Sequence, residues 1–355
     1  MKKQAEVIAE LKRRITGGVY VPGVRMPSEQ ELADELGVNR ITLNKATGVL
    51  VADGWLIRGK SSRDGTYVKD RSLAAFGSLG ALIQCRNSYD YELLHGMMDS
   101  AARSNFLLCV MAPDEKELPH AIRMMRASGV RGGVVAGYGQ LHPDAAGLPV
   151  VFADSVPGDG REHIVVADLD HGARELVDVL RQQGKRDIVF CYYSGFGLEA
   201  NARTAGFLAR LRELGTPAPE RRFFHVNSSH VLVLKKIFSA FPGVSAIVGE
   251  NDVLAFELLQ CARKHFPETV DKLTFAGFGN VREVQRLSPF LTVDQHPYEI
   301  GSRAVERLAA WVRTGSDPAG ETIESLPVTL AGEVRDHGTL VHQSWECCDE
   351  AAGVK

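Results

Sequence analysis

A short run of polar and basic side chains near the N-terminus has the composition needed to read nucleic-acid bases. Asn39, Arg40, Thr42, Asn44 and Lys45 all fall within the run 39-NRITLNK-45. An arginine can donate two hydrogen bonds to guanine, an asparagine amide can pair with adenine, and a lysine suits a phosphate. Each residue alone is equally compatible with an ordinary solvated surface. The chemistry therefore depends on the elements that present these side chains together.

The surrounding sequence predicts two helices joined by a tight turn. The stretch 27-PSEQELADELGV-38 contains Ser28 followed by Glu31, a pair that forms a capping box at a helix start, and Gly37 suits the helix end. Asn39 then supplies the cap of a second helix over 40–54. An earlier helix is expected over 2–16, where apolar residues recur at helical spacing. This arrangement predicts a helix-turn-helix.

Two short strands are predicted directly after these helices, over 55–58 and 66–69, around the polar turn 59–65. A helix, a helix-turn-helix and a β-hairpin in this order describe a winged helix, whose second helix of the pair lies in the DNA major groove. Residues at the hairpin tip suit phosphate or minor-groove contacts. The side chains expected at DNA are Ser28, Gln30, Asn39, Arg40, Thr42, Asn44, Lys45, Lys60, Arg63 and Gly65.

These residues closely resemble the DNA-binding domain of the GntR family of bacterial regulators. The elements PSE-x-ELA, V-x-R-x-T and GT-aromatic-V occur in order and cover about the first 70 residues. The resemblance implies that a dimer binds an operator. Gln30 and Asn44 stand where many family members carry arginine, so we do not expect the operator sequence to be shared with the family.

From residue 79 onwards, apolar strands alternate with amphipathic helices, which is typical of a parallel α/β sheet. About 250 residues and two runs of strands indicate two lobes. The strands are predicted over 79–85, 106–112, 132–137, 149–154, 163–168, 187–193, 222–226, 244–249 and 273–278. The helices are predicted over 90–105, 115–129, 170–184, 199–215, 230–243, 252–266 and 298–315.

Polar residues follow many of these strands, at the edge where open α/β sheets bind ligands. They are rich in groups that form paired hydrogen bonds and poor in metal ligands, which suits a polyhydroxylated or amide-bearing small molecule. Gly279 falls in the same loops. The residues expected at a ligand from their place after a strand are Arg86, Asn87, Asp154, Asp168, Phe196, Asn251, Asp252 and Asn280.

The second part of the chain resembles the LacI/GalR regulators, whose effector domain is related to periplasmic sugar-binding proteins. The matching elements are DLDHGARELVDVLRQQGKRDIVF, RTAGFLARLRELG, SAIVGENDVLAFELL and SPFLTVDQHPYEIGSRAVE. The likeness implies that Arg203 binds ligand hydroxyls or a carboxylate, that Asn251 and Asp252 occupy the family's AND element, and that Asp154 is an acidic pocket residue. Gln295, in the last matching element, is also expected at the ligand. The run 277-GFGN-280 stands where the family commonly has a Gly-aromatic-Asp-Asp run, so it lacks the family's ligand-facing acid. A GntR head on such a body resembles arabinose-responsive repressors and favours a carbohydrate ligand.

Two other classes of function compete with a ligand-responsive regulator: an enzyme, and a ligand receptor without DNA activity. The segment 195-GFGLEA-200 matches a dinucleotide-binding fingerprint, but the strand that follows ends without the acid needed to hold a ribose. The pairing of Asp168 and His171 is better explained as a helix start than as a catalytic pair. A ligand receptor without DNA activity leaves residues 1–70 unexplained. We therefore predict a regulator without enzymatic activity and without a cofactor, and a repressor in preference to an activator.

Charge and length divide the chain at the same place. A chain of 355 residues predicts two or three domains. Its net charge of −3 separates into +3 for residues 1–70 and −6 for the rest, so a basic head is joined to an acidic body. We predict a DNA-binding domain over 1–70, a linker over 71–77, an effector-binding and dimerisation domain over 78–335, and a polar tail over 336–355.

Cysteine usage and hydropathy favour a cytoplasmic protein. The six cysteines are scattered and mostly lie in apolar stretches, as buried reduced thiols do. Cys347 and Cys348 could bind a metal with His337 and His342, although structural zinc sites favour spaced ligands. No apolar run approaches the roughly 20 residues that span a bilayer, and the N-terminus lacks the features of a secretory signal.

Overall fold

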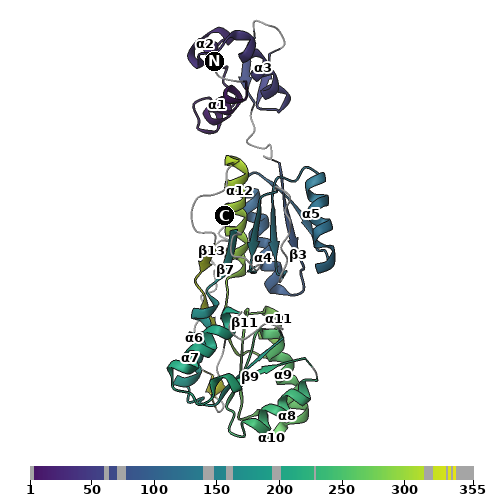
Figure 1. Ribbon diagram of the computed structural model, residues 1–355, viewed down its shortest axis with the longest axis vertical. Coiled ribbons are helices and arrows are strands. Elements are labelled where there is room, and N and C mark those ends of the chain that lie inside the picture. The colour runs from purple at the N-terminus through teal and green to yellow at the C-terminus, as the bar shows by residue number, and fades with distance from the viewer. Residues whose placement is uncertain are drawn as a thin grey trace, which may run out of the picture. The chain divides into compact units, whose positions relative to one another are not determined.

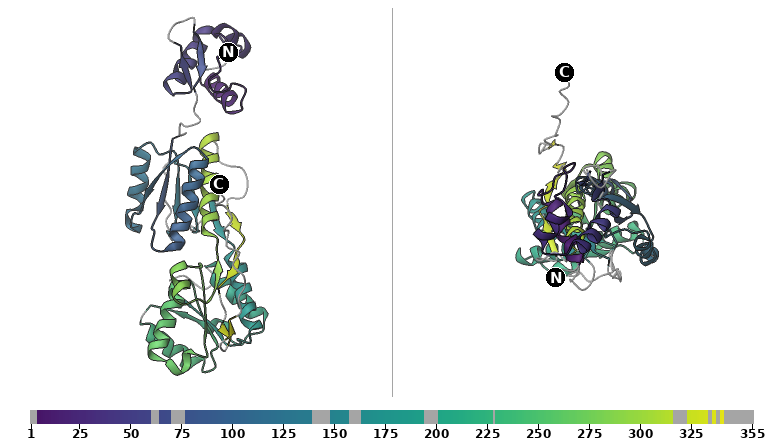
Figure 2. Two further views of the ribbon diagram at one scale, coloured as in Figure 1. Left: turned by 180° about the vertical axis from the view of Figure 1, so that it is seen from behind. Right: turned by 90° about the horizontal axis from the view of Figure 1, so that it is seen from above.

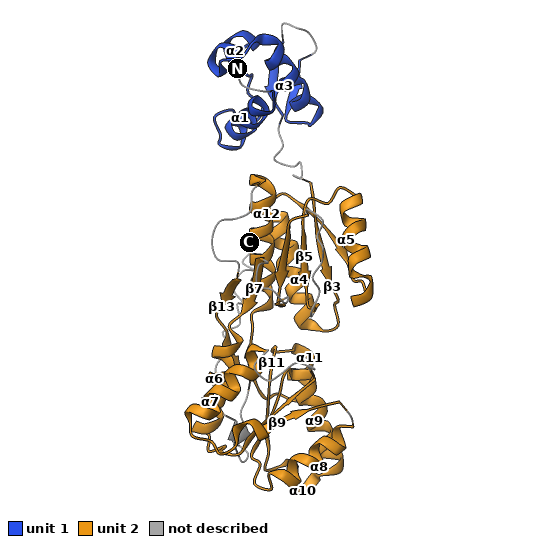
Figure 3. Cartoon of the chain, viewed as in Figure 1, with its two compact units in different colours: residues 1–76 blue, residues 77–355 orange. Residues whose placement is uncertain are grey.

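The computed structural model describes residues 4–59, 64–69, 77–138, 148–156, 163–193, 201–227, 229–315 and 323–332, together with the backbone of 335–336 and 339–340 (Figures 1 and 2). The chain separates into two compact units, Met1–Phe76 and Gly77–Lys355 (Figure 3). We call them the N-terminal unit and the body. Each has hydrophobic clusters of its own.

The N-terminal unit is a winged helix-turn-helix. It contains α1 (Gln4–Thr16), α2 (Glu29–Leu36) and α3 (Arg40–Ala52), followed by an antiparallel hairpin of β1 (Leu56–Arg58) and β2 (Thr66–Val68). Leu11, Leu32 and Leu43 are buried where the three helices meet. Their burial in a common core fixes the angle between α2 and α3, and so the face that α3 presents.

The turn between α2 and α3 has the caps that its sequence predicts. The Ser28 hydroxyl accepts a hydrogen bond from the Glu31 backbone N–H, and the Glu31 carboxylate accepts one from the Ser28 N–H. Gly37 ends α2 with φ of +66°, a left-handed conformation that glycine adopts without strain. The Asn39 side chain then accepts from the Thr42 N–H and starts α3.

The body consists of two lobes, each built on a six-stranded sheet. The first lobe has the strand order β13-β7-β6-β5-β3-β4, and all of its strands are parallel. The second lobe has the order β14-β12-β11-β10-β8-β9, in which only β14 is antiparallel to its neighbour. The strands are β3 (Ser78–Ile83), β4 (Leu107–Met111), β5 (Gly133–Ala136), β6 (Val150–Ala153), β7 (His163–Ala167), β8 (Ile188–Tyr192), β9 (Phe223–His225), β10 (Ala246–Gly249), β11 (Thr274–Phe278), β12 (Leu291–Asp294), β13 (Ile323–Leu326) and β14 (Thr329–Ala331).

Helices cover both sheets, as parallel strands require. In the first lobe, α4 (Ser88–Arg103) and α12 (Pro297–Thr314) lie side by side, and α5 (Leu118–Ala127) lies on the other face (Figure 1). Glycines allow α4 and α12 to approach closely, since a Cβ on Gly96 would lie 1.9 Å from the Tyr298 carbonyl oxygen. The second lobe contains α6 (Leu169–Gln182), α7 (Ala202–Glu213), α8 (His230–Ala240), α9 (Asp252–His265), α10 (Pro267–Val270) and α11 (Arg282–Leu287).

The chain passes between the two lobes three times. It crosses at Asp168 between β7 and α6, at Gln295 and His296 between β12 and α12, and at residues 327–328 between β13 and β14. His296 has φ of +51°, so the backbone turns sharply at the second crossing. Three connecting segments between the two lobes favour a hinge motion, in which the lobes rotate about these segments, over independent movement of each lobe.

The alternation of strands and helices confirms the predicted two-lobed α/β class, but several short elements were missed. The strands β12, β13 and β14 and the helix α11 have three to six residues each, too few for a clear apolar period. The predicted helix over 115–129 begins with a 3₁₀ turn at Glu115–Glu117. Cys109, on the edge strand β4, is exposed where a buried thiol was expected. Across the described ranges, no helix is both long and apolar enough to cross a membrane.

Candidate functional site

One side of α3 carries the residues predicted to meet DNA. The exposed residues are Asn39, Arg40, Asn44 and Lys45, whereas Leu43, Ala46 and Leu50 of the same helix are buried in the core. Thr42 is half-buried. The helix therefore directs an amide, a guanidinium and an ammonium group to the same surface, which can bond to base edges and phosphates.

Glu29, the first residue of α2, connects the side chains of that surface. Its carboxylate accepts a hydrogen bond from Asn44 Nδ2 at 2.8 Å and forms an ion pair with Arg40 Nε at 3.4 Å. The other end of the Asn44 amide accepts from Arg58 at 3.4 Å. Both polar atoms of the Asn44 side chain are thus hydrogen-bonded within the protein. The adenine contact predicted for Asn44 therefore requires its bonds to Glu29 and Arg58 to break.

The remaining predicted DNA residues lie around this network. Ser28 is part of the α2 cap, and Gln30 donates to the Asp34 carboxylate. Gly65 has φ of +79° and lies beside the Arg25 guanidinium, where a Cβ would come within 2.5 Å of Nε. Lys60 and Arg63 fall outside the described residues.

Sequence reasoning missed three residues of this surface. Glu29 and Arg58 join the network only through the fold, because residues 29, 44 and 58 are distant in sequence. Ile41 is 69% exposed although it is large and apolar. An exposed isoleucine at the second position of α3 can contact a thymine methyl group, and its exposure is the signal that could have identified it.

In the body, one side chain from each lobe bonds to Gln295, which lies where the chain crosses between the lobes. Gln295 is 2% exposed, and its Oε1 accepts hydrogen bonds from Arg203 at 3.1 Å and from the Tyr89 hydroxyl at 3.4 Å. Tyr89 belongs to α4 of the first lobe, and Arg203 to α7 of the second. The Arg203 guanidinium lies over the Phe278 ring at 5.8 Å, and among the described residues its Nε has no hydrogen-bond partner.

Asp154 completes this cluster from the first lobe. Burial raises the pKa of Asp154 to about 6, while the Arg203 charge and a hydrogen bond from Tyr89 oppose that rise. Burial also raises the pKa of Tyr89, so the phenol stays protonated and remains a donor. The cluster of Tyr89, Asp154, Arg203 and Gln295 thus presents one acid, one guanidinium and two neutral polar groups, which suits a ligand with several hydroxyls.

Three further residues predicted at the ligand start helices with their side chains. Asn87 accepts from the Tyr89 and Asp90 N–H groups at the start of α4, Asp168 from the His171 N–H at α6, and Asn251 from the Leu254 N–H at α9. Each stands at the carboxyl end of a strand, as predicted, but its side chain is occupied by the cap.

Asp252 and Asn280 organise the second lobe beneath the cluster. The Asp252 side chain is fully buried and accepts from the Val281 N–H, the Thr292 hydroxyl and Gln285. Burial raises its pKa to about 6, and these donors oppose the rise. Asn280 donates to Asp294 at 2.8 Å. Arg86 is exposed and bonds to Gln84 in the first lobe, and Phe196 lies outside the described residues.

A second contact between the lobes joins the starts of two helices. The Ser88 hydroxyl at the start of α4 accepts from the Arg282 backbone N–H at 2.9 Å, and the Ser88 N–H donates to the Glu283 carboxylate at 3.3 Å. Arg282 also forms an ion pair with Glu92. We call Ser88, Glu92, Arg282 and Glu283 the latch, because it joins α4 of the first lobe to α11 of the second.

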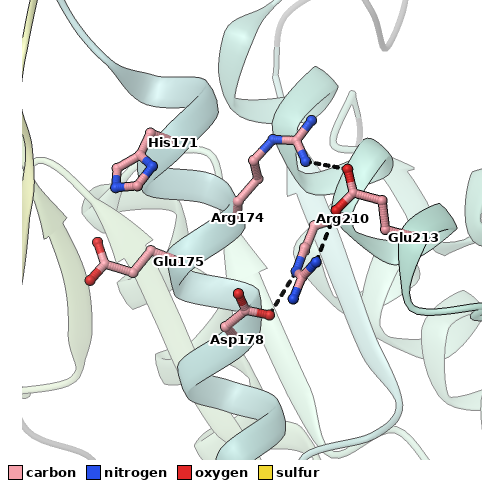
Figure 4. A pocket seen from close by; sticks show the side chains of 6 residues that line it. All are labelled: His171, Arg174, Glu175, Asp178, Arg210 and Glu213. Carbon is pink, nitrogen blue, oxygen red and sulfur yellow. Dashed lines mark hydrogen bonds and ion pairs between the residues drawn. The ribbon is translucent and has the colours of Figure 1, made fainter.

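A surface hollow of about 360 Å³ lies between α6 and α7 and is lined by residues of these two helices (Figure 4). Its two arginines are held by acids: Arg174 pairs with Glu213, and Arg210 pairs with Asp178 and Glu213. The hollow thus contains a network of structural ion pairs.

Within the described residues, no group of His, Cys, Asp or Glu is arranged to hold a metal ion. Cys347 and Cys348, predicted as possible metal ligands, lie outside the described residues.

Two family models match the chain. Residues 3–68 match the gntR family of bacterial regulatory proteins, and residues 177–331 match the periplasmic binding protein-like domain. The first match covers the helix-turn-helix and its wing, and the second covers most of the second lobe and two of the three crossings to the first.

Known relatives match either about a third of the chain or nearly all of it. The chain is 42% identical over 129 residues to a probable fructoselysine utilization operon transcriptional repressor of Escherichia coli. The aligned segment covers 34% of this chain and 50% of that repressor. It thus spans about half the length of that relative. An arabinose metabolism transcriptional repressor of Geobacillus stearothermophilus is 22% identical over 349 residues, which cover 91% of this chain and 95% of the relative.

Solved structures share the fold of the body. A LacI-family regulatory protein of Chloroflexus aggregans has a TM-score of 0.63 and 21% identity over 75% of this chain and 99% of its own. A complex of the transcriptional regulator CelR with cellobiose has a TM-score of 0.62 and 14% identity over 86% of this chain and 98% of its own. The chain therefore joins a winged helix-turn-helix domain of the gntR family of bacterial regulatory proteins to a periplasmic binding protein-like domain.

Proposed function

We propose that this protein is a ligand-responsive transcriptional repressor of sugar metabolism that binds a palindromic operator as a homodimer. One observation carries the proposal: the same chain holds an exposed base-reading face on α3 and a buried polar cluster that joins two lobes at Gln295. The relatives named above as repressors support the direction of control.

The ligand proposed for the cluster is a sugar or sugar derivative. Tyr89 and Asp154 come from the first lobe and Arg203 from the second, so a ligand bonded to all three favours the closed arrangement of the lobes. A ligand shifts a conformational equilibrium only through its different affinity for the two states. We infer that closure changes the geometry of the dimer and lowers its affinity for the operator.

The surface proposed for dimer formation is an exposed apolar face on the first lobe. Tyr91, His95, Met98 and Ala102 form a stripe on α4 with spacings of four, three and four residues, as in a seam between two helices. Tyr91 is 60% exposed and Met98 is 51% exposed. The edge strand β4 continues the face with Val110, which is 44% exposed. A second copy related by twofold symmetry would cover the same stripe on both chains.

The dimer is tested by Met98→Glu, with Met124→Glu as the control. Met124 lies on α5 and is 46% exposed, so both variants place a carboxylate on an exposed methionine site. In sedimentation velocity, Met98→Glu is expected to give monomers where the wild type and Met124→Glu give dimers. Dimers of Met98→Glu as stable as those of the control would disprove this surface.

DNA binding is tested by fluorescence anisotropy with duplexes that the wild-type protein selects from a random pool. Arg40→Ala is expected to weaken binding to the selected duplex by about 1–3 kcal/mol, the value of one bidentate base contact. If the wild type selects no sequence and binds no duplex at low salt, the protein is a receptor or an enzyme and the repressor function fails.

Ligand binding is tested by a thermal-shift screen of sugars, sugar acids and nucleosides. A ligand at 100 times its dissociation constant stabilises the folded state by about 2.7 kcal/mol, which is readily measured. Each hit is then added to the protein bound to its selected duplex, where release of the DNA is expected. Hits confined to nucleosides would overturn the carbohydrate assignment and leave the DNA-binding function intact.

A further inference from the structure

We propose that Glu29 is a specificity-determining residue, which holds Arg40 and Asn44 in an internal network until a matching base sequence replaces it. This inference rests on the proposed DNA-binding function. It goes beyond that function by assigning an acidic side chain a role on a surface that binds a polyanion.

The geometry places Glu29 between both base-reading side chains. One carboxylate oxygen accepts from Asn44 Nδ2 at 2.8 Å, and the other pairs with Arg40 Nε at 3.4 Å. Glu29 is the first residue of α2, where the partial positive charge of the helix N-terminus attracts its carboxylate. Its side chain is only 29% exposed, whereas that of Arg40 is 68% exposed. The acid is therefore the fixed partner, and the arginine is the one able to leave.

The strength of the pair decides what can replace it. An exposed ion pair contributes about 0–1 kcal/mol, so it breaks easily when a better partner is offered. A single phosphate offers Arg40 a charge like that of Glu29, and binding it leaves the Glu29 carboxylate without its ion pair beside the DNA backbone. A guanine offers two acceptors in the geometry of the guanidinium, and a cytosine amino group can donate to the freed carboxylate. The exchange is therefore favourable at matching bases and unfavourable on random sequence.

Asn44 makes the exchange cooperative. Its amide donates to Glu29 through Nδ2 and accepts from Arg58 through Oδ1, so one amide orientation serves both neighbours. When a base amino group donates to Glu29 in place of Arg40, it competes with Asn44 Nδ2 for the same carboxylate and so frees the asparagine amide. We expect Arg40 and Asn44 to engage the bases together, with Arg58 following from β1.

The experiment compares Glu29→Gln with Glu35→Gln in the full-length protein. Glu35 lies on the same helix and pairs with Arg14 at 2.5 Å, so both variants remove one negative charge and one ion pair. Affinity is measured by anisotropy for the duplex that the wild type selects and for a random-sequence duplex of equal length. Glu29→Gln is expected to bind the random duplex about three- to tenfold more tightly than Glu35→Gln does, because Arg40 is freed for phosphate. The preference for the selected duplex is expected to fall by a similar factor.

A second pair of variants shows whether Glu29 acts through Arg40. In the Arg40→Ala background, adding Glu29→Gln is expected to change random-duplex affinity no more than adding Glu35→Gln does. Equal behaviour of Glu29→Gln and Glu35→Gln in the wild-type background would overturn the proposal. So would a loss of affinity for both duplexes together with a lower melting temperature, which is the mark of a purely structural role. A wild type that binds no DNA would instead refute the proposed function.

Discussion

Asp154 shows how much of the ligand cluster depends on single side chains. The sequence places it after a strand, where an acid is expected to meet a ligand, and the fold adds a backbone φ of +54° and the neighbours Tyr89 and Arg203. The pairing of Arg203 with Gln295 across 92 positions could not be predicted from spacing. Asn87, Asp168 and Asn251 illustrate a related limit, since an asparagine or aspartate after a strand suits a helix cap and a ligand equally well.

The raised pKa of Asp154 predicts a pH dependence. Because the folded-state pKa of about 6 lies above the ordinary value near 4, the folded protein binds a proton more tightly than the unfolded chain does. The stability that this group contributes is present below pH 4 and is lost as pH rises through 6. Asp154→Asn removes the titration, so its melting temperature is expected to fall less between pH 5 and 7.5 than that of the wild type. Differential scanning calorimetry at both values checks this, and parallel curves for the two proteins would contradict it.

At the scale of helices and strands, local signals predict the structure well where the elements are long or capped. The Ser28 and Glu31 capping box and the Asn39 cap appear as the sequence indicates, because both depend on residues within one turn. The strand β12 and the helix α11 escape prediction because their buried positions depend on partners in the second lobe. The latch depends on α11, which supplies the Arg282 and Glu283 that contact α4.

The latch predicts how easily the lobes close. Ser88→Ala removes the hydroxyl that accepts from the Arg282 N–H, at a cost of about 1 kcal/mol to the closed arrangement. The concentration of a screen hit needed to release DNA is expected to rise about fivefold. Ser100→Ala, on the same helix, removes a hydroxyl that has no hydrogen-bond partner among the described residues and is expected to leave that concentration unchanged. Equal midpoints for the two variants, measured by anisotropy, would show that the latch does not govern closure.

For the whole molecule, the division of charge at about residue 70 matters more than the total. A chain of net charge −3 binds a polyanion only if a basic surface is kept apart from an acidic one. The matches of residues 3–68 and 177–331 to two different family models agree with that division. The operator and the identity of the ligand do not follow from the sequence, because both depend on hydrogen-bond geometry that single residues do not specify.

This division predicts the salt dependence of DNA binding. Lys45 is exposed on α3 and suits a phosphate, so Lys45→Ala removes one phosphate contact from each copy of a dimer. The slope of log affinity against log salt is expected to become shallower by about 2, with equal loss of affinity for selected and random duplexes. Arg40→Ala is expected to reduce the preference for the selected duplex instead. Salt titrations that show the same selectivity loss for both variants would refute these assignments.

The three crossings between the lobes also have a consequence for synthesis of the protein on the ribosome. The first lobe begins with β3 at Ser78, yet it is completed only when α12 and β13 emerge near Leu326. The N-terminal unit needs no residue beyond Phe76 for its core and is free to fold first. A nascent chain thus carries a folded N-terminal unit well before the body is complete. Under the proposed function, chains that terminate early would bind DNA through α3 and lack the cluster proposed to bind the ligand.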